Sequence, residues 1–140
     1  MTMSERPAGT NMPLVGEASA AGFREQLRQL SDAVAQQRAD FDTAGQLPDD
    51  LFRKLAAIGL FRLWLPRALG GAELSALDFM DVVEEAAALD GTIGWLVGNG
   101  GGMARTGAFL PVQSAQEIFS DPEAFVVSGT AGVGRAVPVA

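Results

Sequence analysis

Cysteine and histidine are both absent from the 140 residues. Without cysteine, the chain has no disulfide framework, no thiolate chemistry and no cysteine zinc site. Without histidine, it contains no Ser-His-Asp triad and no histidine-ligated metal. These two absences exclude the commonest nucleophilic and zinc chemistries within this chain.

Basic residues are few: 10 lysines and arginines face 17 acids, for a formal net charge of −7. From Glu73 onward only Arg105 and Arg135 are basic. Nucleic-acid binding requires a clustered basic face, so we expect no nucleic-acid partner. No apolar run reaches the roughly 18 residues of a membrane span, and the N-terminus lacks the pattern of a signal peptide. A cytoplasmic protein without a membrane span is the default expectation.

The expected fold class is mainly α: a helical bundle of about five helices with a short β stub at the C-terminus. Hydrophobic residues make up 48% of the chain, enough for one globular core. We expect a disordered leader over 1–16, a helical domain over 17–122, and the beginning of a truncated β-domain over 123–140. The expected helices cover 19–38, 48–58, 75–90, 92–110 and 114–119, with a short loop at 40–46.

The second expected helix carries the clearest local signals. Pro48 suits the first helical position, where its missing N–H is not needed. Asp50 and Lys54 are spaced as an i,i+4 ion pair. Gly59 is predicted to end the helix as a left-handed cap. The apolar run that follows, as far as Pro66, is interpreted as an irregular connection pinned into the core.

The third expected helix begins at Ser75, whose hydroxyl is placed to cap it. Its neighbouring acids Glu84 and Glu85 could suggest acid–base work or metal binding. Adjacent residues point apart on a helix, so a solvated face is the favoured interpretation and no metal site is expected. The predicted buried face holds Met80, Val83 and Ala87, and the predicted solvated face holds Asp78, Asp81 and Glu85.

The stretch from Asp90 to Met103 holds six of the 17 glycines. Glycine inside a helix costs about 1 kcal/mol relative to alanine, so this density requires a reason. One interpretation is close helix–helix packing, and the other is a wall of a cofactor or substrate pocket. Thr92 is predicted to cap this helix and Ser114 to begin the next in a capping box. Asn99 could bind a ligand carbonyl or a neighbouring backbone group.

Beyond Pro122 the sequence pattern changes from that of helices to that of strands and turns. Phe125 to Thr130 is predicted to form a strand that enters a turn. The glycines at 129, 132 and 134 lack the spacing of a dinucleotide-binding motif, which also needs a following helix. A second strand is predicted over 135–139. Because two isolated strands are marginal in water, we expect this segment to pair with further polypeptide.

Three blocks between about residues 20 and 140 together resemble one known family. The first places a short helix between proline and glycine boundaries, and the second joins an acidic helix to a Gly-Trp pair. The third begins the predicted strand region. The first block contains Leu47-Pro48, Gly59-Leu60, Leu65-Pro66 and Gly70-Gly71. The second contains Leu89-Asp90-Gly91 and Gly94-Trp95. The third contains Ser128-Gly129-Thr130 and Gly134-Arg135-Ala136. The combination resembles the N-terminal helical domain of the acyl-CoA dehydrogenase superfamily of flavoenzymes.

This resemblance implies FAD, or reduced FMN in a monooxygenase branch, and a tetrameric full-length protein that binds an acyl-CoA or aromatic substrate. It implies substrate-pocket residues Trp95, Asn99 and Met103, and cofactor-binding residues Ser128, Gly129 and Thr130. The base of the dehydrogenases lies in a later domain, so no catalytic residue is expected here. The monooxygenase branch often has a histidine beyond its Gly-Trp pair. This chain lacks it, which favours α,β-desaturation of acyl thioesters over hydroxylation. A non-catalytic helical interaction module is the remaining alternative.

Overall fold

The computed structural model describes residues 18–129, 132, 134 and 137–138. The expected leader lies outside this range. Within it the fold is mainly α, as predicted, although it contains six α-helices rather than about five. They are α1 (Ala20–Arg28), α2 (Ser31–Ala44), α3 (Asp49–Ile58), α4 (Ala76–Leu89), α5 (Gly91–Leu96) and α6 (Val112–Ile118).

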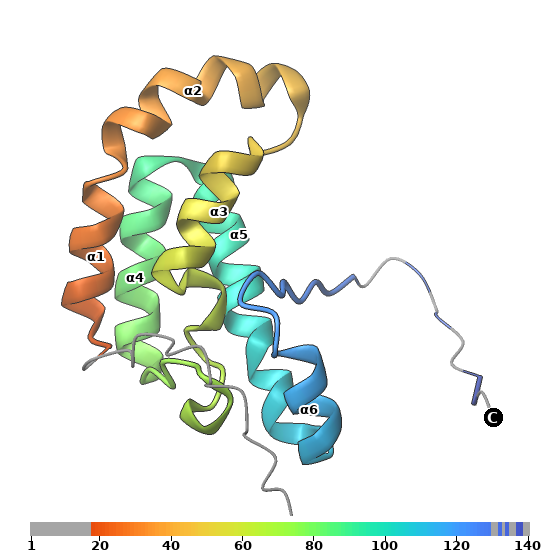
Figure 1. The fold of residues 1–140 in the computed structure, drawn as a ribbon. Helices are drawn as coiled ribbons and strands as arrows, with labels where there is room; N and C mark the ends of the chain where they lie inside the picture. Colours follow the sequence, from red (N-terminus) through yellow and green to blue (C-terminus); the bar gives the residue numbers. More distant parts are fainter. Residues whose placement is uncertain (1–17, 130–131, 133, 135–136, 139–140) are drawn as a thin grey trace, which may run out of the picture.

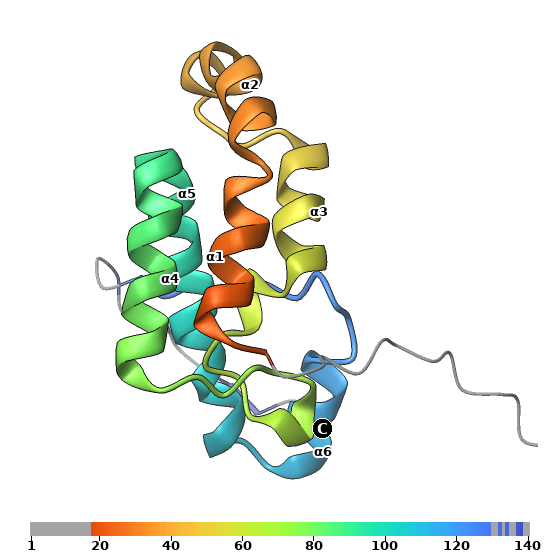
Figure 2. The same cartoon turned by 90° about the vertical axis from the view of Figure 1, so that its left-hand side faces the viewer.

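Helices α1, α3, α4 and α5 lie alongside one another, α2 crosses one end of the bundle and α6 lies at the other end (Figures 1 and 2). Helix α4 packs against both α1 and α5. The main core lies among these four helices. Its fully buried side chains include Leu27, Leu51, Leu55, Phe61, Val82 and Ile93.

The prediction of one helix over 19–38 and a loop over 40–46 was wrong. The regular α-helix is interrupted by a turn at Gln29 and Leu30, both of which keep right-handed helical dihedral angles, and the chain then continues in α2 as far as Ala44. No proline or glycine marks this break. The bend turns α2 across the end of the bundle (Figure 1), where Val34 and Phe41 are buried. Burial of these two side chains in the tertiary fold therefore determines where the first helix ends.

Helix α3 agrees with its local signals. Pro48 occupies the N-cap, one position before the predicted one, and Gly59 ends the helix in a left-handed conformation with φ of 92°. The Lys54 ammonium lies 3.2 Å from the Asp50 carboxylate. The following apolar run includes a short 3₁₀ turn, Leu60–Arg62, and is buried as expected.

The buried face of α4 was predicted one residue out of register. The structure buries Phe79, Val82 and Ala86. Met80 is 60% exposed and Ala87 is also exposed. The N-terminus agrees with the prediction, because the Ser75 hydroxyl accepts a hydrogen bond from the Asp78 amide at 3.2 Å.

The expected helix over 92–110 is divided into three parts. Helix α5 is followed by a π-helical turn, Val97–Gly101, and then by a 3₁₀ helix, Ala104–Phe109. Its cap is Asp90 rather than Thr92, because the Asp90 carboxylate accepts a hydrogen bond from the Thr92 amide at 2.8 Å.

The last helix and the segment after it also differ from expectation. Helix α6 begins after Pro111, so Ser114 lies inside the helix instead of capping it. The predicted strand over 125–130 is not observed: residues 123–129 contain no strand, and neither do the other described positions. Of the second predicted strand, over 135–139, only residues 137 and 138 are described. A boundary between a helical domain and a β-domain near 122–123 stays a prediction. No helix in the described part of the chain is long and apolar enough to cross a membrane.

Candidate functional site

Trp95 is the aromatic residue of α5, and 72% of its surface is accessible. It borders an open depression of about 470 Å³ between α4 and the glycine-rich segment. This volume falls within the range of small-molecule sites. The lining residues are Val83, Gly91, Gly94, Trp95, Gly98 and Asn99.

The structure brings together two of the three expected substrate-pocket residues. Trp95 and Asn99 both line the depression, whereas Met103 is half-buried and does not line it. The Asn99 amide nitrogen donates to the Trp95 carbonyl at 3.4 Å. This hydrogen bond agrees with the interpretation that Asn99 binds a neighbouring backbone group. It leaves the amide oxygen and the second N–H of the side chain for other contacts.

The expected cofactor-binding residues lie in the segment after α6. Ser128 and Gly129 are exposed, and a Cβ atom added to Gly129 would meet nothing within 4 Å. Thr130 lies outside the described residues. The segment therefore offers a free hydroxyl and uncovered backbone at 128–129, a chemistry that suits contact with a polar ring edge or a phosphate.

This segment is connected to the bundle by an aromatic cluster that the sequence did not reveal. The ring of Phe125 packs edge-on against Phe61, with 4.8 Å between centroids and an interplanar angle of 85°. The ring centroid of Phe52 lies 6.0 Å from that of Phe125 and 4.9 Å from that of Phe61, on which Phe52 stacks. The same Phe125 ring lies against Gly100 of the π-helical turn.

Arg62 is a buried cation that sequence reasoning missed, with only 7% of its surface exposed. Its guanidinium donates to the carbonyls of Phe119 and Asp121 just after α6, and to Leu69 at 3.4 Å. Burial lowers the pKa of Arg62 from its usual value, and the Asp121 charge opposes that change. A single arginine inside the apolar run 60–65 was the available signal, although its partners follow only from the tertiary fold.

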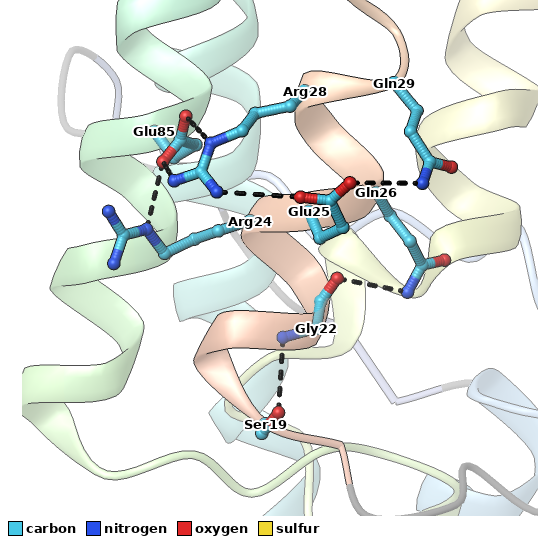
Figure 3. Close-up of polar contacts among 8 residues, drawn as sticks. All are labelled: Ser19, Gly22, Arg24, Glu25, Gln26, Arg28, Gln29 and Glu85. Carbon is cyan, nitrogen blue, oxygen red and sulfur yellow. Dashed lines mark hydrogen bonds and ion pairs between the residues drawn. The ribbon is translucent and has the colours of Figure 1, made fainter.

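A charged cluster joins α1 to α4 (Figure 3). Glu85 accepts hydrogen bonds from Arg28 at 2.6 Å and from Arg24 at 3.0 Å, and its side chain is only 16% exposed. The Arg28 hydrogen bond, followed by that from Arg24, lowers the pKa of Glu85. Glu85 was expected to be simply solvated; the structure makes it the ion-pair partner that holds α1 against α4.

Trp64 packs beside Gly102 of the glycine-rich segment. It stacks on Phe79 with 4.1 Å between ring centroids, and the Arg105 guanidinium lies 5.5 Å from its centroid. This half-buried tryptophan is therefore a packing residue with a cation over its face. The described residues contain no group of three or more acidic side chains placed to hold a metal ion.

Comparison with curated proteins identifies three relatives. Indole-3-acetate monooxygenase of Acinetobacter baumannii is 30% identical over 90 residues, which are 64% of this chain and 23% of that protein. Pigment production hydroxylase of Rhodococcus erythropolis is 30% identical over 115 residues, 81% of this chain and 29% of that protein. Indole-3-acetate monooxygenase of Pseudomonas putida is 27% identical over 117 residues, 84% of this chain and 29% of that protein.

The chain spans about a quarter of the length of these relatives. No solved structure matches it. The family described as acyl-CoA dehydrogenase, N-terminal domain, matches residues 18–109, which include the helices α1 to α5 and the Trp95 depression. The chain therefore belongs to the acyl-CoA dehydrogenase family, of which it carries the N-terminal helical domain.

Proposed function

We propose that this chain forms the front wall of the substrate pocket in a flavin-dependent oxygenase that acts on an aromatic small molecule. The observation that carries the proposal is the exposed Trp95 beside the depression. A large indole ring held at a surface without a covering side chain offers a flat apolar face to another ring. Two of the relatives are named for indole-3-acetate and the third is named a hydroxylase, which agrees with this chemistry.

Three of the residues around the depression have distinct roles in this proposal. Trp95 stacks on the substrate ring, and Gly98 lets that ring approach the backbone closely. The groups of Asn99 that are not used by the Trp95 carbonyl hydrogen-bond a polar substituent. Once covered by further polypeptide, the depression excludes water, which strengthens each of these polar contacts.

The residues at 128–130 are the proposed contacts of the cofactor, either reduced FMN or FAD. The flavin supplies two electrons, so that one atom of O₂ enters the substrate as a hydroxyl group and the other leaves as water. This chain contributes the binding and orientation of the substrate. We further propose that the complete protein is a tetramer, as the family resemblance implies.

Desaturation of an acyl thioester, with FAD as the hydride acceptor, is the second candidate. The observation that favours it is the absence of histidine from the chain. The resemblance places a histidine beyond the Gly-Trp pair in the hydroxylating branch, so its lack is a departure from that branch.

One assay separates the two candidates. The complete polypeptide that the gene encodes is purified and supplied with reduced FMN or FAD, oxygen and indole-3-acetate. We expect a product that carries one added oxygen atom by mass spectrometry. In a parallel anaerobic assay with acyl-CoA thioesters, substrate-dependent bleaching of oxidised FAD without hydroxylation would overturn the proposal in favour of desaturation. The 140-residue chain alone is expected to catalyse neither reaction.

A further inference from the structure

Phe125 is packed in a socket whose floor is the backbone of the glycine-rich segment. A Cβ atom built on Gly100 would lie 2.3 Å from Cε2 of Phe125 and 2.8 Å from its Cδ2. Carbon atoms do not approach this closely, so any side chain at position 100 displaces the ring. Phe61 and Phe52 form the walls of the socket.

The π-helical turn supplies this floor. Gly100 is buried within Val97–Gly101, the turn that also carries Asn99 on its outer side. One contact thus joins the element that lines the depression to the segment that continues to Ser128. π-Turns of this kind occur frequently at functional sites because the wider turn redirects side chains.

Arg62 holds the carbonyls of Phe119 and Asp121, and beyond Asp121 few other contacts hold the chain as far as residue 129. Ala124 and Val126 are half-buried against the small cluster of Leu65, Ala104 and Phe119. Glu123 reaches Arg53 only at 3.9 Å, and both side chains are largely exposed. Val127, Ser128 and Gly129 are exposed. Phe125 is therefore the last aromatic anchor before the proposed cofactor contacts.

We propose that Phe125 is a positioning residue: its contact with Gly100 fixes residues 128–129 relative to the Trp95 and Asn99 depression. The Phe125 socket thereby determines the position of the proposed cofactor contacts relative to the proposed substrate contacts. This inference rests on the proposed function, because it assigns cofactor contact to Ser128 and Gly129. The socket itself can be tested without any cofactor.

The socket is tested by a double-mutant cycle in the 140-residue chain. Alanine is a better helix former than glycine, so Gly100→Ala without a clash raises the melting temperature by about 2 °C. With Phe125 in place we expect Gly100→Ala to lower it by about 5 °C. In the Phe125→Ala background the same change is expected to raise it. An equal effect of Gly100→Ala in both backgrounds would show that the two residues do not interact and would overturn the socket.

The positioning role is tested in the complete polypeptide with a matched pair of variants. Phe125→Leu is compared with Phe41→Leu, which removes the same atoms from a buried phenylalanine of α2 at the far end of the bundle. We expect Phe125→Leu to weaken flavin binding about tenfold and Phe41→Leu to change it less than twofold, both below their melting temperatures. Mild truncation to leucine keeps both variants folded.

The outcomes are distinguishable. If the unmodified polypeptide binds flavin and both variants bind it equally well, Phe125 is only a packing residue and the inference fails while the proposed function stands. If the unmodified polypeptide binds no flavin, the proposed function fails and the positioning role fails with it. A further readout is the split between kcat and KM: displacement of the flavin lowers kcat, whereas a general loss of stability changes neither constant in the folded fraction.

Discussion

Gly94 of α5 and Ala87 of α4 lie so close together that a Cβ atom built on Gly94 would be 2.5 Å from the Cβ of Ala87. At Gly94, this close approach confirms the prediction that glycine allows two helices to pack closely. Gly94→Ala forces the two helices apart and is expected to cost about 2 kcal/mol of the free energy of unfolding. Urea denaturation followed by circular dichroism measures this loss.

Gly91→Ala is the matched control for that substitution, because a Cβ atom on Gly91 would meet nothing within 4 Å. We expect it to leave the free energy of unfolding unchanged or to raise it slightly. Equal losses at both positions would mean that helix separation is not set at Gly94.

Arg62→Met is expected to destabilise the chain by about 2 kcal/mol, since it leaves the buried carbonyl of Phe119 and the partly buried carbonyl of Asp121 without this donor. Arg67→Met, at an exposed position nearby, is expected to change stability by less than about 0.5 kcal/mol. Hydrogen exchange of the amides in α6 locates the effect. Unchanged protection of α6 in Arg62→Met would contradict the assignment of Arg62 as the clamp on that helix.

Glu85→Gln is expected to lower the melting temperature at pH 7 by about 3 °C. The folded-state pKa of Glu85 lies below its ordinary value of 4.5, because Arg28 and Arg24 hydrogen-bond the carboxylate. The stabilisation is therefore complete above about pH 4.5 and is lost as the pH falls through the lowered pKa. The melting temperatures of Glu85→Gln and of the unmodified chain should converge at low pH. Glu117→Gln, at an exposed position of α6, should leave the melting temperature at pH 7 unchanged.

Trp95→Ala is expected to lower kcat/KM for an aromatic substrate about tenfold in the complete polypeptide. Because the side chain is 72% exposed, the free energy of unfolding should change by less than about 0.5 kcal/mol. Leu77→Ala removes a side chain that is 80% exposed on α4 and should affect neither quantity. A kcat/KM for Trp95→Ala equal to that for Leu77→Ala would remove Trp95 from the substrate site.

The parts of the fold that the sequence predicted are those with signals local to the chain. Pro48 and Gly59 delimit α3 through backbone geometry alone, and the Ser75 hydroxyl caps α4 within one turn. Such effects depend on neighbouring residues, so spacing is sufficient to find them. The resemblance, rather than any local signal, implied Trp95, Asn99 and Met103 as pocket residues, and of these Trp95 and Asn99 line the depression.

The parts that could not be predicted depend on contacts between distant segments. Both Met80 and Phe79 belong to acceptable apolar stripes of α4, and only the position of α1 and α5 decides which stripe is buried. No proline or glycine marks the break at Gln29, so the sequence carries no local signal for it. Arg62 finds two of its acceptors, the carbonyls of Phe119 and Asp121, more than 50 positions away, and no side-chain pattern encodes them.

The π-helical turn has a consequence for length variation in this segment. A π-turn closes i→i+5 hydrogen bonds, one residue more than the i→i+4 bonds of an α-helix. The wider turn accommodates its additional residue locally, so removal of one residue from Val97–Gly101 would restore an α-helical turn while the helix before it, with Trp95, keeps its direction. The bulge itself would be lost, and with it the positions at which Asn99 lines the depression and Gly100 meets the ring of Phe125. Related chains that keep both contacts are therefore expected to keep the length of this segment.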